Sequence, residues 1–560
     1  MKKTICFILA AVCIFTTACV QPANDYSNVV SAAGEAETEK APVPVNDIAA
    51  VYIETDNFIV REEYRACSIK VVDIYGNTVE DAGGKIKIRG NSTSSGAKKP
   101  YNFKLSEKTE LLGMGKAKKW CLLANCYEKT LIRNEMVFDF ARNATRLEYT
   151  PDSRFVDVYL NGVLQGNYIL CEAVEASSSR VDIDVDGSEF LLERDVREDE
   201  GTVYINSPVL GIRFGINEPE APAREQLEYL MSFLRKAENA LKSGKMSEIE
   251  KYFDVESIVD FYIIMEYFKQ VDISVGSTRF YIKDGKIYGG PVWDFDLTMG
   301  NCLSSYYTAY NNVGGSGKSC EGIYCNVDWF RYFNKISEFQ KLRNDRFLEL
   351  QDDIVNLYSR TVNGISYIDE VTESYGASFA RNYKEAGWRI DAVYSELERI
   401  PDKTYEGNVD YLRTWLKERN EWLLTHWGLT QRNYVVPEKA SGMKADGGII
   451  YGLKAGVTPK KCEDMFALNA TVTATGEYVG TGSTVRNEGV TYGFVVLGDV
   501  DGNGIVDARD YIRVRRDFLG TYDIEGLCEL SADCNGDGKI SATDYLMVRR
   551  HITGNFNLYE

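Results

Sequence analysis

The chain has 560 residues, of which 44% are hydrophobic and 12% aromatic, so it can bury a large core and divide into several domains. Its formal net charge of −19 at pH 7 argues against a nucleic-acid partner, because phosphate binding requires basic surface, and it suits divalent cations. The chain has only two histidines, His426 and His551, so the composition argues against a Ser-His-Asp triad or a multi-histidine metal site. Any chemistry must therefore rest mainly on carboxylates, lysines and arginines.

The N-terminus predicts export. A lysine pair precedes the apolar run 5–15, which is too short to span a bilayer and is followed by small and polar residues. We interpret 1–18 as a signal peptide and 19–47, rich in Ala, Glu, Pro and Ser, as a flexible tether. Two alternatives stay open, a secreted protein or a lipoprotein anchored to the membrane through Cys19, where Thr16 replaces the leucine usual at such sites. Both predict an extracellular or cell-surface protein.

Ten cysteines follow Cys19, and export would allow them to form disulfides. Their spacings contain no CxxC pair, so buried thiols with one or two bridges are favoured over a zinc site. The sequence does not determine their pairing.

Residues 48–435 form the main body. Its first half reads as extended segments with turns, at 50–55, 67–76, 84–90, 100–106, 120–126 and 154–172. Its second half carries apolar residues at helical spacing, at 223–241, 255–268, 336–358 and 409–427. Strands followed by helices predict an α+β, two-lobed, enzyme-like body.

The first cluster of possible chemistry is "IKIRGNSTSSGAKKPYNFKL", residues 86–105. A strand enters a Gly/Ser/Thr loop and returns as a strand carrying Lys104, so backbone amides and a lysine are available for phosphate. The loop is neither GxGxxG nor the GK[ST] of a Walker loop. On these residues alone, a hairpin with a polar tip is the favoured alternative.

The second cluster is "VLQGNYILCE", which ends at Glu172. Tyr168 and Leu170 share one strand face with Glu172, and a buried glutamate requires a cationic partner. Lys104 is a candidate for that partner. The alternative is an exposed glutamate at a strand end.

The third cluster is "KIYGGPVWDFDLTMGN", residues 286–301. At the end of an extended run, Asp294 and Asp296 are expected on one strand face. Two such carboxylates suit a magnesium ion or a catalytic pair, whereas one of them capping the following turn is the alternative. Asp272 lies upstream, after a predicted helix and before the strand 279–282.

Taken in order, four blocks of the body resemble the CotH (spore coat protein H) kinase family. They are "IKIRGNSTSS…KKPYNFKL", "LLANCYEKTLIRN", "VDVYLNGVLQGNYILCE" and "VDISVGSTRFYIKDGKIYGGPVWDFDLTMGN". The resemblance implies an atypical protein-kinase fold that binds ATP and magnesium and phosphorylates protein serines.

The resemblance also assigns roles to individual residues. Asp294 would bind the metal with Asp296 beside it, and Asp272 would orient or deprotonate the acceptor hydroxyl. Lys104 would neutralise phosphate, and Glu172 would hold Lys104. In the second block, Glu128 and Thr130 replace the family's usual aspartate and serine, whereas Asn125, Arg133 and Asn134 are retained.

From 436 to 496 the chain alternates β-branched residues with Gly, Thr and Asn and lacks a helical stripe. It reads as a small β-module that precedes the last domain. No chemistry is assigned to it.

Two acidic loops lie 34 residues apart near the C-terminus. Calcium requires several oxygen ligands from a loop that reverses at its sixth position, where glycine tolerates the backbone. Gly504 and Gly538 occupy that position. The candidate ligands are Asp499, Asp501, Asn503, Asp507 and Asp510 in loop 1 and Asp533, Asn535, Asp537, Ser541 and Asp544 in loop 2.

Each loop is followed by a helix, beginning "DYIRVRR" and "DYLMVRR", so 497–560 resembles a type I dockerin, an all-α module of paired EF-hand-like loop-helix repeats. The resemblance implies two bound calcium ions, chelation by the aspartates at position 12, and a cohesin domain of a scaffoldin as partner. The arginine pairs are candidate partner-binding residues, or else a solvated helix face: Arg515, Arg516, Arg549 and Arg550.

These readings predict an exported, cellulosome-associated protein that docks through calcium and carries a CotH-type kinase-like domain with a possible protein substrate. An exported protein meets little ATP, so a noncatalytic pseudokinase or scaffold is the first alternative. A carbohydrate-active hydrolase in polysaccharide degradation is the second. Glycosidases, however, set two carboxyl groups ~5 to 10 Å apart across a sugar, usually from different elements.

Overall fold

The computed structural model describes residues 44–197, 201–303, 319–359, 365–395, 397–429, 437–438, 441–446, 448–466, 470–487 and 490–559. The expected signal peptide, Cys19 and most of the tether lie outside these residues. The chain divides into two compact units, 1–43 and 44–560, and the described elements belong to the second. That unit mixes helices and sheets.

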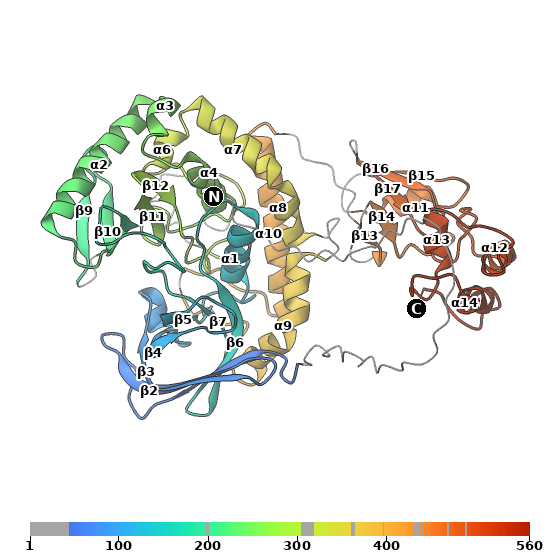
Figure 1. Cartoon of the computed structure of the whole chain (residues 1–560), viewed down its shortest axis with the longest axis horizontal. Coiled ribbons are helices and arrows are strands. Elements are labelled where there is room, and N and C mark those ends of the chain that lie inside the picture. The colour runs from blue at the N-terminus through green and yellow to red at the C-terminus, as the bar shows by residue number, and fades with distance from the viewer. Residues whose placement is uncertain are drawn as a thin grey trace, which may run out of the picture. The chain divides into compact units, whose positions relative to one another are not determined.

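Seven strands close into a barrel in the first half of the body (Figure 1). Their order is β1-β2-β3-β4-β5-β7-β6, and a parallel pairing of β1 with β6 closes the ring. All the extended segments expected before residue 172 lie on this barrel. The strands are β1 (Ala49–Glu54), β2 (Arg65–Val72), β3 (Thr78–Ile88), β4 (Tyr101–Thr109), β5 (Ala117–Leu123), β6 (Ser153–Leu160) and β7 (Val163–Glu172).

A second sheet follows, coloured green in Figure 1, with the order β12-β11-β8-β10-β9. Every pairing in it is antiparallel, so no crossover helix is needed between neighbouring strands. Its strands are β8 (Phe190–Arg194), β9 (Val203–Asn206), β10 (Arg213–Glu218), β11 (Thr278–Lys283) and β12 (Lys286–Gly289).

Helices complete the body, and α4 lies at its centre. Every residue of α4 except Glu256 is buried, which agrees with its nearly continuous apolar sequence, and Asp254 caps its first turn by accepting a hydrogen bond from the Ser257 amide. One hydrophobic core joins the barrel, the second sheet and the helices. The helices are α1 (Arg133–Ala144), α2 (Arg224–Ser243), α3 (Met246–Ile249), α4 (Val255–Tyr267), α6 (Phe330–Phe333), α7 (Ser337–Glu349), α8 (Gln351–Tyr358), α9 (Tyr367–Lys384) and α10 (Tyr405–His426).

One helix expectation was wrong. The segment 336–358 is divided at Leu350 into α7 and α8. Leu350 is buried and ends one helix while it begins the next, so burial continues across the break and the helical apolar spacing does not reveal it. The helices expected at 223–241, 255–268 and 409–427 are confirmed as α2, α4 and α10.

The C-terminal part has separate cores. A five-stranded sheet, β13-β14-β17-β16-β15, packs around one of them in the segment that was expected to be a β-module, together with a short helix that was not expected. Its elements are β13 (Lys444–Asp446), β14 (Ile449–Tyr451), α11 (Pro459–Glu463), β15 (Thr471–Thr473), β16 (Thr484–Asn487) and β17 (Val490–Phe494).

The two acidic loops precede α12 (Ala508–Phe518) and α14 (Ala542–Ile552), as expected, with α13 (Leu527–Ala532) between them. The two long helices pack together, and the rings of Tyr511 and Tyr545 lie 6.0 Å apart edge to face.

Across the described part of the chain, no helix combines the length and apolar character required to cross a bilayer.

Candidate functional site

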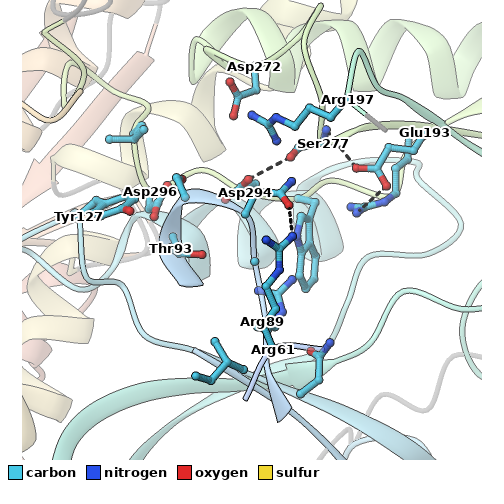
Figure 2. Close-up of a pocket in the computed structure, with 18 of the residues that line it drawn as sticks. Arg61, Arg89, Thr93, Tyr127, Glu193, Arg197, Asp272, Ser277, Asp294 and Asp296 are labelled. Atoms are coloured by element: carbon cyan, nitrogen blue, oxygen red, sulfur yellow. Dashed lines mark hydrogen bonds and ion pairs between the residues drawn. The ribbon is translucent and has the colours of Figure 1, made fainter. Parts of the chain in front are cut away.

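A cavity of about 800 Å³ is lined by both the barrel and the second sheet (Figure 2). It contains Asp272, Asp294 and Asp296, which were predicted from separate stretches of sequence, and the tip of the 86–105 hairpin. The full lining is Arg61, Lys87, Ile88, Arg89, Gly90, Asn91, Ser92, Thr93, Asn102, Tyr127, Glu193, Arg197, Asn217, Asp272, Ser277, Arg279, Trp293, Asp294, Asp296, Leu297 and Leu397.

The backbone around the two neighbouring aspartates differs from the expectation. Strand β12 ends at Gly289, and 290–295 has no regular structure, so Asp294 and Asp296 do not share a strand face. Asp294 has a φ of +69°, a left-handed conformation that breaks strand alternation. Both carboxylates reach the same cavity all the same.

Buried amide side chains hold this loop in place. Gln270 Nε2 donates to the carbonyl oxygens of Trp293 and Asp294 at 2.9 and 2.8 Å, and Gln270 Oε1 accepts from the Asp272 amide at 3.1 Å. One side chain therefore links the backbones of two of the cavity's aspartates. Asn134 Oδ1 accepts from the Phe295 amide at 2.7 Å.

The carboxylates of the cavity repel one another, and this repulsion favours the binding of a cation between them. Burial, followed by the carboxylates of Asp294 and Asp272, raises the pKa of Asp296 well above its ordinary value. Ser277 Oγ donates to Asp294 Oδ2 at 3.0 Å, so one oxygen of Asp294 is already oriented. This donor set of carboxylate oxygens fits a magnesium ion.

Five cationic side chains line the same cavity, and sequence reasoning missed all of them: Arg61, Lys87, Arg89, Arg197 and Arg279, the last of which forms an ion pair with Glu193 at 3.1 Å. The guanidinium groups of Arg89 and Arg279 lie 5.0 and 5.3 Å from the Trp293 ring centre. In Figure 2, Arg61 and Arg89 lie on one side of Asp294, whereas Asp272 and Arg197 lie on the other side. Arg89 lies within the 86–105 motif and Trp293 within the 286–301 motif. Their positions in these motifs were the signal in the sequence that could have identified them as site residues.

The predicted pairing of Lys104 with Glu172 was wrong. Lys104 pairs directly with Lys119 across β4 and β5, whereas Glu172 pairs with Trp120 across β5 and β7. The side chains of neighbouring residues 119 and 120 point to opposite faces of the sheet. Because directly paired residues share a face, Lys104 and Glu172 also lie on opposite faces.

Both residues have other neighbours, and neither lines the cavity. Lys104 Nζ lies 4.5 Å from the Tyr64 ring centre. Glu172 is buried and lies 4.0 Å from Arg180 Nε, and it accepts a hydrogen bond from the Asp152 amide at 3.1 Å. Burial lowers the pKa of Lys104 and raises that of Glu172.

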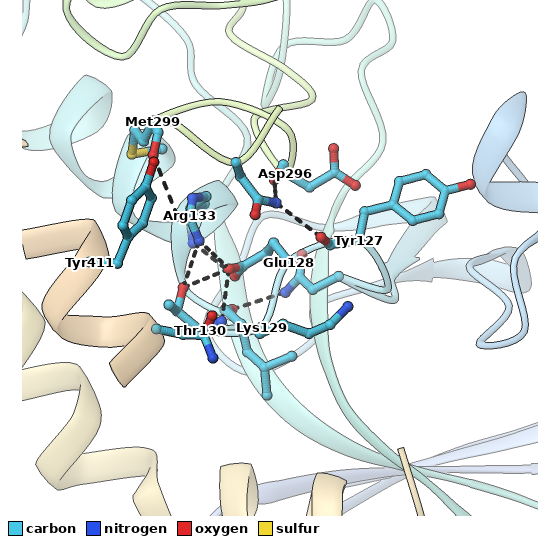
Figure 3. Close-up of polar contacts among 12 residues, drawn as sticks. Tyr127, Glu128, Lys129, Thr130, Arg133, Asp296, Met299 and Tyr411 are labelled. Atoms are coloured by element: carbon cyan, nitrogen blue, oxygen red, sulfur yellow. Dashed lines mark hydrogen bonds and ion pairs between the residues drawn. The ribbon is translucent and has the colours of Figure 1, made fainter. Parts of the chain in front are cut away.

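The second motif block is a buried network of hydrogen bonds and ion pairs next to the cavity (Figure 3). Glu128 accepts from Thr130 Oγ1 at 2.6 Å and forms an ion pair with Arg133 at 2.8 Å. The substituted residues therefore satisfy each other, and their replacement of aspartate and serine leaves no unpaired charge. Asn301 Nδ2 ties the block to the cavity loop by donating to the carbonyls of Tyr127 and Asp296 at 2.9 and 2.8 Å.

Loop 1 has the geometry of a cation site. Ligand atoms of Asp499, Asp501 and Asp510 lie within 4.8 Å of one another. Asp499 is fully buried, and its Oδ1 has no hydrogen-bond partner among the described residues. Asp510 Oδ1 accepts from the Val500 and Asp501 amides at 2.9 and 3.1 Å, and burial raises the pKa of Asp510 to about 6. An orphaned buried oxygen among carboxylates fits calcium.

Loop 2 repeats this construction. Asp533 Oδ2 accepts from the Gly538 amide at 2.7 Å, as Asp499 Oδ2 does from the Gly504 amide at 3.1 Å. Asp544 Oδ1 accepts from the Cys534 amide at 2.9 Å, the counterpart of the Asp510 contact. The remaining predicted ligands lie along the same loops: Asn503 and Asp507 in loop 1, and Asn535, Asp537 and Ser541 in loop 2.

All four arginines of the pairs are exposed. Arg516 lies over the Tyr522 ring at 5.6 Å and Arg550 over the Phe556 ring at 5.4 Å, so the duplication extends to their packing.

Comparison with protein families gives a match for the body and a match for the C-terminal module. Residues 86–423 match the family described as CotH kinase protein, and 497–553 match the dockerin type I domain. The first match covers more than half of the chain, so the protein belongs to the CotH kinase protein family. No curated protein matches the chain. The dockerin domain implies calcium binding and a cohesin partner in a cellulosome-type assembly.

Proposed function

We propose that the body is an atypical kinase that binds a magnesium nucleotide in the 800 Å³ cavity and phosphorylates serine hydroxyls of a protein. The observation that carries the proposal is the meeting of three aspartates and five cations on this one cavity. Nucleotide phosphates require cations around their oxygens, and their metal requires carboxylates.

The roles follow from position. Asp294 and Asp296 would hold magnesium, which supplies charge neutralisation to phosphate oxygens. Asp272 accepts the proton of the acceptor hydroxyl. The arginines of the cavity take the phosphate-neutralising role expected of Lys104, which lies outside the lining. The barrel and the second sheet with its helices are the two lobes that enclose the nucleotide.

For the whole chain we propose the boundaries 1–18, 19–47, 48–435, 436–496 and 497–560. The first is a signal peptide and the last docks to the cohesin through its two calcium-loaded, EF-hand-like repeats. The protein acts outside the cell, in a cellulosome or at the surface, with Cys19 as a possible lipid attachment site. Its placement among polysaccharide-degrading enzymes rests on the dockerin alone.

Calorimetric titration of the full chain with ATP tests the nucleotide site. We expect binding in magnesium that is lost in EDTA and lost in Asp294→Asn, with the melting temperature unchanged. Asp391→Asn, a surface aspartate paired only with Arg389 among the contacts described, is the matched control and should bind normally. Equal ATP binding by wild type and Asp294→Asn would remove the metal assignment.

A further inference from the structure

Calcium loop 1 is covered by the β-module that precedes it. The Thr481 amide donates to Asp499 Oδ2 at 2.8 Å, so a residue outside the dockerin holds the first calcium ligand. The Gly456 amide donates to the Gly504 carbonyl at 2.8 Å, and Thr475 Oγ1 donates to the Gly502 carbonyl at 2.6 Å. These contacts reach positions 1, 4 and 6 of the loop.

The packing at this contact leaves no room for a side chain. A Cβ placed on Gly480 would lie 2.6 Å from Asp499 Oδ2 and nearer still to Gly502 O and Gly504 N. From the opposite side, a Cβ on Gly504 would lie 2.7 Å from the Cβ of Tyr478. The two segments, 478–481 and 502–504, are therefore in direct backbone contact.

Loop 2 provides an internal comparison because it is a copy of the same loop. Gly536 and Gly538 stand at positions 4 and 6, and a Cβ on either would meet nothing within 4 Å. Asp533 is only partly buried, and the amides that bond its carboxylate belong to its own loop, those of Gly536, Asp537 and Gly538. Segment 478–481 of the β-module therefore forms a wall over loop 1. Among the described residues, no segment covers loop 2 in the same way.

We propose that the β-module forms one wall of the loop 1 calcium site and slows release of that ion, so that the two sites exchange calcium at different rates. The inference rests on the dockerin domain and is independent of the proposed kinase activity. The two carboxylate oxygens of Asp499 have different roles: Oδ2 accepts from the Thr481 and Gly504 amides, whereas Oδ1 has no hydrogen-bond partner among the described residues and is the oxygen presented to the ion.

Release from loop 1 requires the ligands to move apart, and each anchored backbone group opposes that motion. The anchored carbonyls of Gly502 and Gly504 belong to the turn that reverses around the ion. Among the described residues, the hydrogen bonds that oppose opening of loop 2 come from the loop itself and from the preceding helix α13. A wall held in place before calcium binds also lowers the ordering cost of binding.

The experiment mixes the calcium-loaded full chain with a fluorescent chelator in a stopped-flow instrument. Wild type should show a slow and a fast phase of equal amplitude. Asp537→Ala, which removes a ligand of loop 2, should abolish the fast phase and thereby identify it. One common rate for both sites in wild type would overturn the proposal.

Gly480→Ala tests the wall itself. Overpacking a tight contact shifts the equilibrium toward the open contact by roughly ten- to hundredfold. The slow phase should therefore accelerate at least roughly tenfold, while the fast phase stays unchanged. Gly476→Ala is the matched control, because its Cβ meets only the Asn503 carbonyl at an ordinary 3.9 Å. An unchanged slow phase in Gly480→Ala would overturn the wall.

Thr475→Val provides a second test without added bulk. It removes the hydroxyl that donates to the Gly502 carbonyl and keeps the side-chain volume nearly constant. The slow phase should accelerate by roughly threefold to tenfold, the equivalent of one lost hydrogen bond. This variant decides the question if Gly480→Ala fails to fold, and identical rates in Thr475→Val and wild type would then overturn the proposal.

Discussion

Gln270 is the residue that organises the cavity without lining it. Its buried amide bonds the backbones of Trp293, Asp294 and Asp272, and Asp294 adopts a left-handed conformation that costs energy for a residue other than glycine. A positioning residue of this kind has no motif of its own. The aspartates could be predicted from the sequence, but the amide that aligns them could not, because the contacts join segments that only the fold brings together.

Gln270→Met should therefore weaken magnesium-dependent ATP binding by about tenfold or more. The variant leaves the buried Trp293 carbonyl and the partly buried Asp294 carbonyl without their donor, and an unsatisfied buried carbonyl costs about 1–3 kcal/mol. Calorimetry with and without magnesium measures the effect. Gln351→Met is the matched control, since Gln351 is also fully buried but bonds Asn420 and Phe347. The positioning role is refuted if both variants lose stability alike and neither changes the magnesium dependence.

Lys98 makes stability depend on pH. It is buried, donates to the Asn167 carbonyl and to Asn382 Oδ1, and burial lowers its pKa to about 7. An unfolded lysine keeps its proton up to its ordinary pKa near 10.5, so between these values the unfolded chain binds more protons and the folded state gains stability as pH rises. The burial penalty of the charged lysine is fully present below about pH 7.

Urea unfolding of wild type and Lys98→Met checks this sign. Relative to the variant, wild type should gain stability between about pH 7 and pH 9.5, because only wild type carries the titrating amine. A stability difference that is constant over this range would contradict the shifted pKa. Taking the difference cancels the contribution of the buried thiols, which titrate in both proteins.

The register of strand pairing decides which side chains of neighbouring strands lie on the same face of the sheet. The strands of the barrel were predictable from alternation, and the hairpin 86–105 is present as β3 and β4. The faces of the sheet on which Lys104 and Glu172 lie were not predictable, because they depend on the combined register of two pairings, β4 with β5 and β5 with β7. Similarly, Asp294 and Asp296 were located by motif, while their loop conformation depends on Gln270 and Asn134.

Calcium removal should loosen the elements that follow the acidic loops. Without the ion, clustered carboxylates repel, and the orphaned oxygen of Asp499 stays buried without a partner. Hydrogen exchange of the full chain in EDTA should rise sharply in α12 and α14 and stay unchanged in the barrel strands, which act as the internal control. Unaltered protection of both helices would contradict a calcium-dependent fold.

At the scale of the molecule, the duplicated helices offer a partner two equivalent surfaces. Arg515 and Arg516 occupy the same positions after loop 1 as Arg549 and Arg550 after loop 2, and all are exposed. Arginine pairs bidentately with carboxylates, so we predict that the cohesin surface that contacts these pairs is acidic.

Charge reversal of one pair to glutamate should cost little, since the module can rotate and present the other. Reversal of both pairs should cost about 2–5 kcal/mol of binding free energy. Titration against the cognate cohesin at saturating calcium measures each variant. Full affinity in the double reversal would mean that the arginines form a solvated face and contribute no contact.

The separate cores explain how much of the architecture was predictable. Composition and motif boundaries located the body, the β-module and the loops, and each has its own buried cluster. The contact between the β-module and loop 1 was not predictable, because Gly480 and Thr481 carry no pattern that distinguishes a wall from a turn.

The central claim, that the cavity supports phosphoryl transfer, is tested most directly by following γ-labelled phosphate from magnesium ATP in the full chain with an added serine-rich protein. We predict label on serine hydroxyls of the chain or of the added protein with wild type. Asp272→Asn should still bind magnesium ATP and transfer none, because it lacks the proton acceptor. Wild-type protein that binds magnesium ATP but leaves the label on the nucleotide would contradict the claim and define the body as a noncatalytic scaffold.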